Sequence, residues 1–309
     1  MRRARVFAPA TIGNVGPGFD VLGLAIDGLG DTVEVRLDVK ENEVIVTGRD
    51  ALLVPKSMTK NAAAIAARAY LAKKGYKGGV RIYVLKGLPM SGGLGGSAAS
   101  SVGGALAAAI ALDEPYTDDD VLLAALRGEA AVAGTHFDNL APCLYGGLTC
   151  VLPAIGKGAP RVCRIGVHRD WWVALVSPSH QLETRRARAV LPKQMKTQQW
   201  VEQMARTTAL AYAFAAGDVS LARHALVDRF AETARAKLIP SFAKVKKAAE
   251  KAGAIGASIS GAGPSVFALC EDMMTASKAA RAMQDAFGKV ESTAHVGRID
   301  KLGARKVQH

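Results

Sequence analysis

Short stretches in the first half of the chain alternate between apolar and polar residues, which predicts β-strands with one buried face. The stretches with this period of two are 31–39, 43–47 and 80–85. Because only a short polar turn separates the first two stretches, we expect them to pair as a hairpin.

Three helices are predicted in the same half of the chain. Ala, Ile and Leu recur at helical spacing over 59–74. An Ala-rich helix is expected to follow the glycine-rich loop 87–96 and to end near Leu112. Thr117 begins a sequence that resembles a capping box, which predicts a helix up to about Val132.

The second half of the chain has a different order of elements. Pro and Gly residues make 152–159 the best candidate linker, which predicts domains at 1–155 and 156–309. The expected strands are 173–176, 255–260, 266–270 and 293–296, and the expected helices are 193–216, 219–226, 240–251 and one before the final strand. The chain is therefore predicted to be α+β, with a mixed α/β first domain and a ferredoxin-like α/β sandwich in the second.

Composition and charge narrow the class of protein. The 309 residues are 50% hydrophobic and 22% charged, which is enough apolar surface for a real core and excludes intrinsic disorder. Lys and Arg exceed Asp and Glu by 40 to 27, a net charge of +13 that raises the alternative of a nucleic-acid-binding protein. The basic residues are scattered and only 6% of residues are aromatic, so platforms for base stacking are scarce and we expect no nucleic-acid partner.

The chain ends and the cysteines bear on its compartment. No apolar segment follows the basic residues near Met1, so a signal peptide is not expected. The most apolar stretch, 97–112, is shorter than the roughly 20 residues that span a bilayer, so we expect no membrane association. The four cysteines lack the spacing of a zinc site or a disulfide framework, which predicts buried free thiols and a cytoplasmic location.

The stretch 89–101 (PMSGGLGGSAASS) carries the clearest chemistry. Glycines let the backbone approach a ligand, and the N-terminus of the next helix offers unpaired N–H groups to an anion, so the stretch predicts a polyphosphate cradle. A Walker A loop is excluded because no Lys follows the glycines. The dinucleotide pattern G-x-G-x-x-A matches at 93–98, but no acidic residue ends a second strand about 20 residues later. A purely structural glycine-rich turn is the remaining alternative.

Three motifs in order resemble those of the GHMP kinases. Residues 89–99 are similar to their phosphate-binding motif P-x-x-x-G-L-G-x-S-A-A, and 259–265 (ISGAGPS) resembles their third, glycine-rich motif. Residues 8–20 (APATIGNVGPGFD) resemble the first motif of the homoserine kinase branch. Further segments similar to that branch are 128–129, 135–142, 146–147, 184–192 and 235–240. Together these motifs cover most of the chain.

The resemblance implies a two-domain GHMP kinase fold, ATP and Mg²⁺ as cofactors, L-homoserine as the small-molecule substrate, and a homodimer. It implies that Ser97 and Glu129 hold the metal and that Asn61 contacts adenine. The nucleotide loop that it implies consists of Pro89, Met90, Ser91, Gly92, Gly93, Leu94, Gly95, Gly96, Ser97, Ala98 and Ala99. Taken alone, Glu129 is equally typical of a solvated helix carboxylate and Asn61 of an N-cap.

For the amino-acid substrate, the resemblance implies Asn14, Asp20, His136, Asn139, Thr184, Arg188 and Arg235. Two arginines suit a carboxylate, and Asp20 with Asn14 suits an ammonium group. Kinases for mevalonate, shikimate or a sugar are the alternatives within the family. The catalytic residues implied are Asn139, Glu129 and Ser97. Because mevalonate kinase has an Asp base where this chain has Asn139, we expect in-line attack on the γ-phosphoryl group without a strong general base.

Some positions depart from the family pattern. Gly96 stands where the motif usually has a first Ser, Ala262 replaces a common Ser, and Ile12-Gly13 precede Asn14 where Ser-Ala is usual. Each departure leaves the residues with an implied chemical role in place. We expect the affinity for nucleotide to be the property that they alter.

Overall fold

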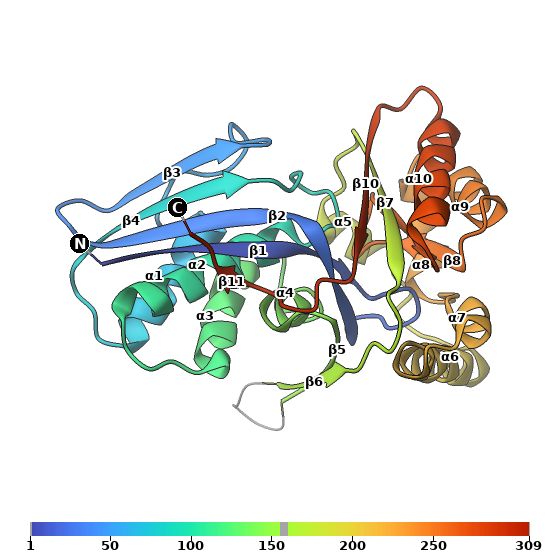
Figure 1. Cartoon of the computed structure of the whole chain (residues 1–309), viewed down its shortest axis with the longest axis horizontal. Helices are drawn as coiled ribbons and strands as arrows, with labels where there is room; N and C mark the ends of the chain where they lie inside the picture. Colours follow the sequence, from blue (N-terminus) through green and yellow to red (C-terminus); the bar gives the residue numbers. More distant parts are fainter. Residues whose placement is uncertain (1, 155–159, 309) are drawn as a thin grey trace.

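Two β-sheets, each with helices packed against it, form the framework of the computed structural model, which describes residues 2–154 and 160–308 (Figure 1). Within these residues the first sheet has seven strands, in the order β11-β1-β2-β4-β3, with β5 paired to β2 and β6 paired to β5. The strands of this sheet are β1 (Arg3–Gly13), β2 (Leu22–Val39), β3 (Glu43–Gly48), β4 (Gly79–Lys86), β5 (Leu148–Leu152), β6 (Arg161–Ile165) and β11 (Arg305–Lys306).

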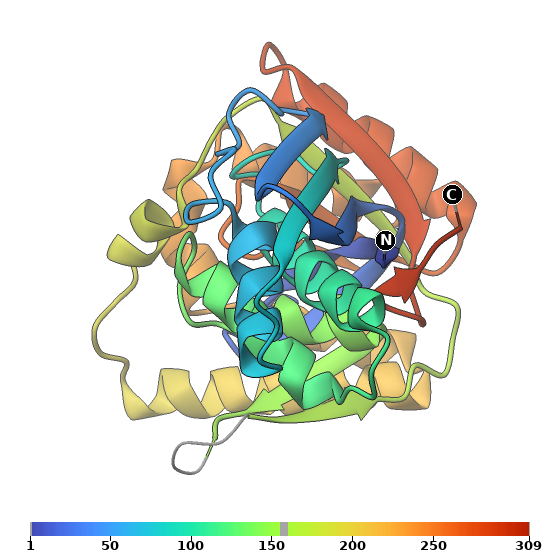
Figure 2. The ribbon, with the colours of Figure 1, turned by 90° about the vertical axis from the view of Figure 1, so that its left-hand side faces the viewer.

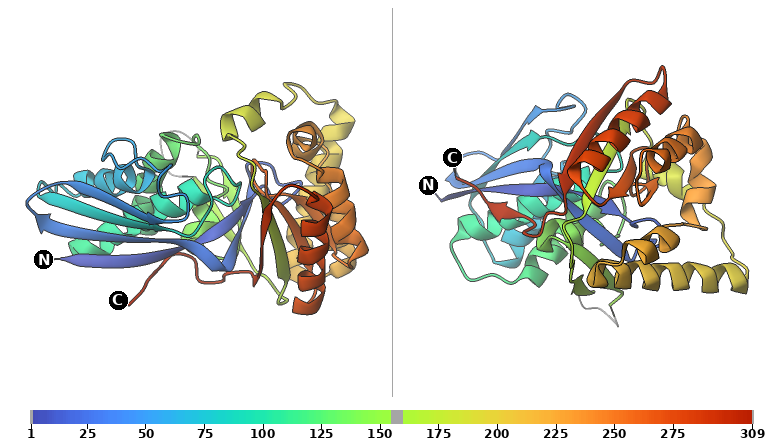
Figure 3. Two further views of the ribbon diagram at one scale, coloured as in Figure 1. Left: turned by 90° about the horizontal axis from the view of Figure 1, so that it is seen from above. Right: turned by 45° about the vertical axis from the view of Figure 1, so that its right-hand side comes forward.

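The second sheet has four described strands in the order β10-β7-β9-β8, and all neighbours are antiparallel. Its strands are β7 (Trp172–Pro178), β8 (Gly256–Ile259), β9 (Val266–Cys270) and β10 (Ser292–Arg298). Numbered along the chain, this is the order 4-1-3-2 of a ferredoxin-like unit, which confirms the predicted sandwich. The helices α9 (Phe242–Lys251) and α10 (Met273–Phe287) cover one face of this sheet and form its outer layer (Figure 3).

Helices α1 to α4 cover one face of the first sheet (Figure 2). Their bounds are α1 (Ala62–Lys73), α2 (Gly96–Leu112), α3 (Asp118–Ala130) and α4 (Leu140–Tyr145). The remaining helices are α5 (Thr184–Ala189), α6 (Thr197–Ala216), α7 (Val219–Ala225), α8 (Ala231–Arg235) and the 3₁₀ helix η1 (Ala236–Leu238). No helix in the described parts of the chain is long and apolar enough to cross a lipid bilayer.

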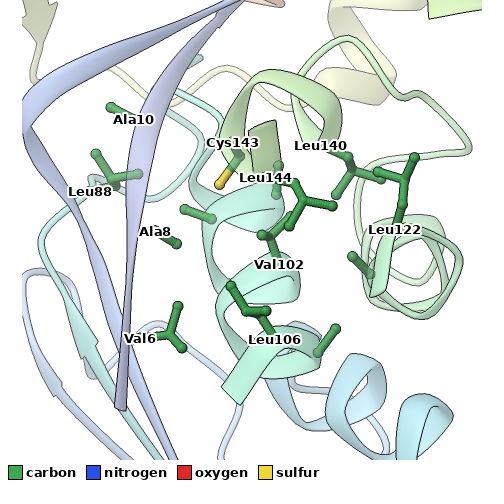
Figure 4. Packing of buried hydrophobic residues seen from close by; sticks show 14 of the residues in the cluster. Val6, Ala8, Ala10, Leu88, Val102, Leu106, Leu122, Leu140, Cys143 and Leu144 are labelled. Carbon is green, nitrogen blue, oxygen red and sulfur yellow. The ribbon is translucent and has the colours of Figure 1, made fainter. Parts of the chain in front are cut away.

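Helix α2 lies at the centre of the helical layer that covers the first sheet, and it is buried along almost its whole length. Val102 and Leu106 face Val6, Ala8 and Ala10 of β1 in the core (Figure 4). On the side facing α1, a Cβ added to Gly104 would lie 2.3 Å from the carbonyl oxygen of Ala63. The small residues of α2 therefore allow its backbone to approach the neighbouring helix closely, which accounts for the Ala-rich and Gly-rich sequence.

The predicted hairpin between 31–39 and 43–47 is wrong, although both strands form. β3 pairs in parallel with β4, and β4 lies between β3 and β2. The connection from β3 to β4 runs through α1, as a parallel pair requires a crossover. Alternation along one strand shows which face is buried, but it does not identify the neighbouring strand.

The candidate linker 152–159 joins two strands of the same sheet. Leu152 is paired with Arg161 across the antiparallel pair of β5 and β6, and residues 155–159 lie outside the described residues. The chain passes to the second sheet between β6 and β7. After β10 it returns to the first sheet, where Lys306 of β11 pairs with Val6. The segment 156–309 thus contributes two strands to the first sheet.

Candidate active site

The glycine-rich loop turns into α2 at Gly95, which has a positive φ of 66°. A Cβ at this position would lie 1.9 Å from Oγ1 of Thr11 on β1, so only glycine fits between the loop and the strand. The N–H of Thr11 also donates to the carbonyl oxygen of Leu94 at 3.1 Å. The first sheet therefore fixes the point at which the positive end of the α2 dipole meets the loop.

The second sheet holds the other side of this loop. Ser260 and Ser265, which flank the β8–β9 turn, donate hydroxyl hydrogen bonds to the carbonyl oxygens of Gly93 (2.7 Å) and Gly92 (2.5 Å). Because a trans peptide directs its N–H opposite to its C=O, the N–H groups of Gly93 and Leu94 point away from these serines. The two sheets thus orient the loop amides jointly, which is what a phosphate cradle needs.

A buried ion pair between Asp31 and Lys86 lies beneath the loop. Asp31 also accepts hydrogen bonds from the N–H groups of Gly87 and Leu88 at 3.1 Å and from the Ser100 hydroxyl at 2.8 Å. Lys86 donates to the carbonyl oxygen of Gly96 at 3.2 Å. This cluster connects the end of β4 to the first turns of α2. Neither Asp31 nor Lys86 was a predicted site residue, although a lysine at the end of an alternating strand pointed to this position.

Glu129 on α3 reaches the start of α2. Burial raises the pKa of its carboxyl to about 7, while a hydrogen bond from Ser97 opposes that rise and the nearby Asp138 adds to it. Its Oε2 atom is buried and has no hydrogen-bond partner among the described residues. A carboxylate and a hydroxyl side by side, with one oxygen unsatisfied, are the ligand types that Mg²⁺ takes from proteins beside phosphate oxygens. These two residues therefore fit a magnesium ion.

Asn139 and Asp138 lie where the phosphate loop meets the end of β1. The Thr11 hydroxyl donates to Oδ1 of Asn139 at 2.8 Å, so the amide oxygen is held by protein and Nδ2 lies on the side of Gly13. Asp138 is buried beside it and accepts a hydrogen bond from the N–H of Asn14. Burial, first, and the nearby Asp20 raise the pKa of Asp138 to about 7, against the influence of Arg188. Asp138 was not among the predicted site residues, although it lies next to Asn139, which was.

Two arginines and one carboxylate surround the ring of Phe19. Arg188 binds Asp20 with two hydrogen bonds of 2.6 and 3.1 Å. The guanidinium carbons of Arg188 and Arg235 lie 5.4 and 5.5 Å from the centre of the Phe19 ring, and Phe230 packs edge-on against that ring at 4.9 Å. Both cations therefore lie against the same aromatic ring. Phe19 was part of a quoted motif but was not predicted as a site residue.

Arg235 is only 2% exposed, and its hydrogen bonds in the structure go to the carbonyl oxygens of Ala187 (3.0 Å) and Gly261 (2.9 Å). Burial, first, and the nearby Arg188 lower the pKa of this guanidinium. The described residues place no carboxylate in an ion pair with it. A buried cation held only by neutral carbonyl groups is suited to an anionic ligand.

Polar side chains of the predicted site also have structural tasks. Asn14 donates to the carbonyl oxygen of Gly261 (2.9 Å) and accepts from the N–H of Asp20 (3.0 Å), which ties the two sheets together. Asn61 caps α1 by accepting from Ala64 at 3.2 Å, as the sequence allowed, and donates to Pro55 at 2.8 Å. His136 lies 3.7 Å from Asp20, and burial, first, lowers the pKa of its ring.

Most of the predicted site residues line one cleft of about 370 Å³. The predicted residues that it brings together are Asn14, Asp20, Asn61, Pro89, Met90, Ser91, Gly92, Gly93, Gly95, Gly96, Ser97, Glu129, His136, Asn139, Thr184, Arg188 and Arg235. Leu94, Ala98 and Ala99 do not line it, because their side chains are buried in the core. Lining residues that the prediction omitted include Val54, Pro55, Lys86, Ser100 and Asp138. Val54 and Pro55, at the end of the apolar stretch 51–55 (ALLVP) before α1, carried no recognisable signal.

Comparison with known proteins agrees with this geometry. Residues 59–147 match the model of the GHMP kinases N terminal domain, and residues 210–289 match the model named GHMP kinases C terminal. The chain belongs to the GHMP kinases.

Its relatives narrow the family further. The chain is 40% identical to a homoserine kinase of Xanthomonas campestris, over 99% of this chain and 94% of that protein. It is also 40% identical to a homoserine kinase of Pyrococcus abyssi, over 90% of this chain and 91% of that protein. A crystal structure of homoserine kinase from Cytophaga hutchinsonii superposes with a TM-score of 0.92 at 37% identity, covering 99% and 98% of the two chains. Within the GHMP kinases, the chain therefore belongs to the homoserine kinase family.

The ion pair beneath the loop leads to a stability prediction. In Asp31→Asn, Lys86 keeps its charge in a buried site without its carboxylate, so we expect a loss of about 3–5 kcal/mol in the free energy of unfolding. Urea denaturation measures it. Asp170→Asn breaks an ion pair with Lys301 in which both side chains are more than half exposed, and it should leave the midpoint almost unchanged. Equal effects of the two substitutions would contradict the role given to the buried pair.

Proposed function

We propose that this chain transfers the γ-phosphoryl group of ATP to the side-chain hydroxyl of L-homoserine, forming O-phospho-L-homoserine for threonine biosynthesis. One observation supports this most directly: the cleft joins a phosphate loop at a helix N-terminus to two arginines held over Phe19. The homoserine kinases of Xanthomonas campestris and Pyrococcus abyssi are 40% identical to this chain over 99% and 90% of its length. A nucleotide and a small carboxylate would meet in this cleft.

The arginines favour an amino acid over a neutral alcohol. Arg235 is buried with neutral partners, so binding of a substrate carboxylate supplies the missing anion. Asp20 is paired with Arg188 in the structure and can exchange that cation for the substrate ammonium, while Arg188 takes the carboxylate. A zwitterionic substrate thus replaces one ion pair by two. Sugars offer neither charge, and mevalonate and shikimate offer only the carboxylate.

A substrate screen tests the function. ADP release is measured with Mg·ATP against homoserine, mevalonate, shikimate and galactose. We expect turnover with homoserine alone, and Arg235→Lys should raise the KM for homoserine, since an ammonium group cannot make the planar two-point contact of a guanidinium. Activity on one of the other three alcohols but not on homoserine would exclude the proposal.

Ser97 and Glu129 are the residues that we assign to Mg²⁺. When bound, the ion would neutralise charge on the phosphate oxygens during transfer. Glu129 must be ionised to hold it, and the pKa of about 7 means that the carboxyl takes up a proton as the pH falls below neutrality. Ser97 stands at the first turn of α2, so its hydroxyl lies next to the amides that receive the phosphates.

The activity is predicted to depend on pH, because Mg²⁺ and protons would both bind the Glu129 carboxylate. As the pH falls below about 7, protons displace the metal from Glu129, and kcat/KM should decrease. Because Mg²⁺ and protons compete for one carboxylate, a higher Mg²⁺ concentration should shift the acid midpoint to lower pH. Rates measured from about pH 5.5 to about pH 8.5 at several Mg²⁺ concentrations check this prediction. An acid midpoint of kcat/KM that stays the same at every Mg²⁺ concentration would contradict the assignment of Glu129 to Mg²⁺.

For the chemical step we propose in-line attack of the substrate hydroxyl without a strong general base. The oxygen of Asn139 is occupied by Thr11, so its Nδ2 group is free to donate and can orient the hydroxyl or a phosphate oxygen, but it cannot take a proton. The loop amides and the N-terminus of α2 provide the positive environment that a loose transition state needs, and Lys86 helps to hold that turn through the carbonyl oxygen of Gly96. Asp138, held by the N–H of Asn14, orients the end of β1.

Asp138 and His136 line the cleft beside Asn139 and could each act as a base instead, so they supply the test of this mechanism. We expect His136→Ala and Asp138→Asn each to lower kcat by less than about 100-fold at saturating homoserine, as loss of positioning would. Steady-state rates across pH measure this. A loss of about 10⁴-fold in either variant with homoserine binding intact, and with the acid limb of the pH profile gone, would establish a general base.

We also propose a homodimer that forms through the outer face of α6. The exposed positions of this fully described helix carry no charged residue, and they include Trp200 (53% exposed), Met204 and Tyr212 (65%). Glu202 and Arg206 lie to the side and pair with each other at 2.9 Å. Two copies that each carry a net charge of +13 repel one another, so they can associate best through an uncharged apolar face.

The free cysteines fit a cytoplasmic, reducing setting.

Light scattering after size-exclusion chromatography tests the dimer. The wild type should have the mass of two chains, and Trp200→Glu should have the mass of one, because the substitution buries an unpaired carboxylate at the contact. Tyr116→Glu changes an exposed aromatic residue elsewhere and should remain dimeric. A monomeric wild type at micromolar concentration would exclude the proposal.

A further inference from the structure

Two of the four cysteines face each other across the β5–β6 pair. Cys150 on β5 is directly opposite Cys163 on β6 in the antiparallel register. Both are free and only partly buried, whereas Cys143 and Cys270 are fully buried. The sequence spacing did not reveal this pairing, because it depends on the register of the two strands.

Directly opposed residues in an antiparallel pair have Cα atoms about 4.5 or 5.5 Å apart, and their side chains point to the same face of the sheet. Both separations fall within the 4.4–6.8 Å that disulfides usually span, so a bond between these cysteines requires no rearrangement of the strands. Burial raises the pKa of the Cys150 thiol, and the nearby Cys163 raises it further, which is consistent with two thiols in mutual contact.

We propose that Cys150 and Cys163 are a redox modification site that forms a reversible cross-strand disulfide. The oxidant is a low-molecular-weight disulfide such as oxidised glutathione. One cysteine thiolate attacks a sulfur of the oxidant, so a mixed disulfide forms and one glutathione thiolate leaves. The second cysteine thiolate then attacks the protein sulfur of that mixed disulfide, which releases the second glutathione and leaves the Cys150–Cys163 bond. Two protein protons are given up, and the two glutathione thiolates take up two.

The place of the Cys150–Cys163 bond in the fold indicates that it affects stability and not turnover. β5 pairs with β2 at Leu22, close to Asp20, and β6 is the last strand before the chain crosses to the second sheet. A covalent link here closes a short loop in the unfolded chain, which stabilises the folded state. Neither cysteine lines the cleft, so turnover does not depend on the bond. This inference is independent of the proposed function.

The experiment incubates the full-length folded protein with oxidised glutathione, then measures intact mass, disulfide-linked peptides and Tm. We expect the mass to fall by two hydrogen atoms, a peptide linking Cys150 to Cys163, and a Tm about 5 °C higher that returns on reduction. Cys163→Ser and Cys150→Ser are the matched controls. Each should gain one glutathione adduct and show no rise in Tm.

Two results would overturn the proposal. The first is a wild type that carries two glutathione adducts, because the thiols would then not reach each other. The second is a wild type that remains fully reduced while the Ser variants also fail to react, because the thiols would then be inaccessible. A linked peptide that forms only after denaturation in urea would count against it in the same way.

Discussion

The glycine-rich loop at the start of α2 is held from both sides, and the rest of the site depends on this constraint. Thr11 of the first sheet contacts Gly95 and Leu94, while Ser260 and Ser265 beside the second sheet take the carbonyl groups of Gly93 and Gly92. A loop of glycines has many conformations in solution, so its amides can converge on an anion only if other elements restrict it. The two sheets supply that restriction together. The cleft accordingly forms at their junction, and Asn14 and Arg235 meet there on the carbonyl oxygen of Gly261.

Around this loop the protein buries charges of different kinds. Asp31 and Lys86 neutralise each other and have further hydrogen bonds, so they serve the architecture. Glu129 and Arg235 are different, because each is buried with an incomplete set of partners. Burial raises the pKa of Glu129 and lowers that of Arg235, so in each case it disfavours the charged form. A bound cation at Glu129 or a bound anion at Arg235 would offset this free-energy cost of burying a charge. Ligand binding is therefore favoured where folding alone leaves the electrostatics unsatisfied.

Local patterns in the sequence predicted local structure well. The strands at 43–47, 80–85 and 266–270 and the long helices form close to the predicted bounds. The pairing of strands was harder to predict: β3 joins β4 instead of β2, and the segment expected to be a linker connects β5 to β6. Side-chain periodicity reports the environment of one segment, whereas pairing is decided by contacts between segments that are far apart in the sequence.

The site, like the fold, has features that the sequence predicts and others that depend on contacts between distant segments. The sequence by itself determined the family, the glycine-rich loop and most residues that line the cleft, because these lie in short motifs whose glycines and polar groups must keep a fixed spacing. Only the tertiary structure decided that Lys86 pairs with Asp31, that Phe19 supports both arginines, that Asp138 is buried beside Asn139, and that Cys150 faces Cys163. Each of these depends on how far two distant segments approach each other. That distance is set by the packing of the two sheets and their helices, and no local pattern records it.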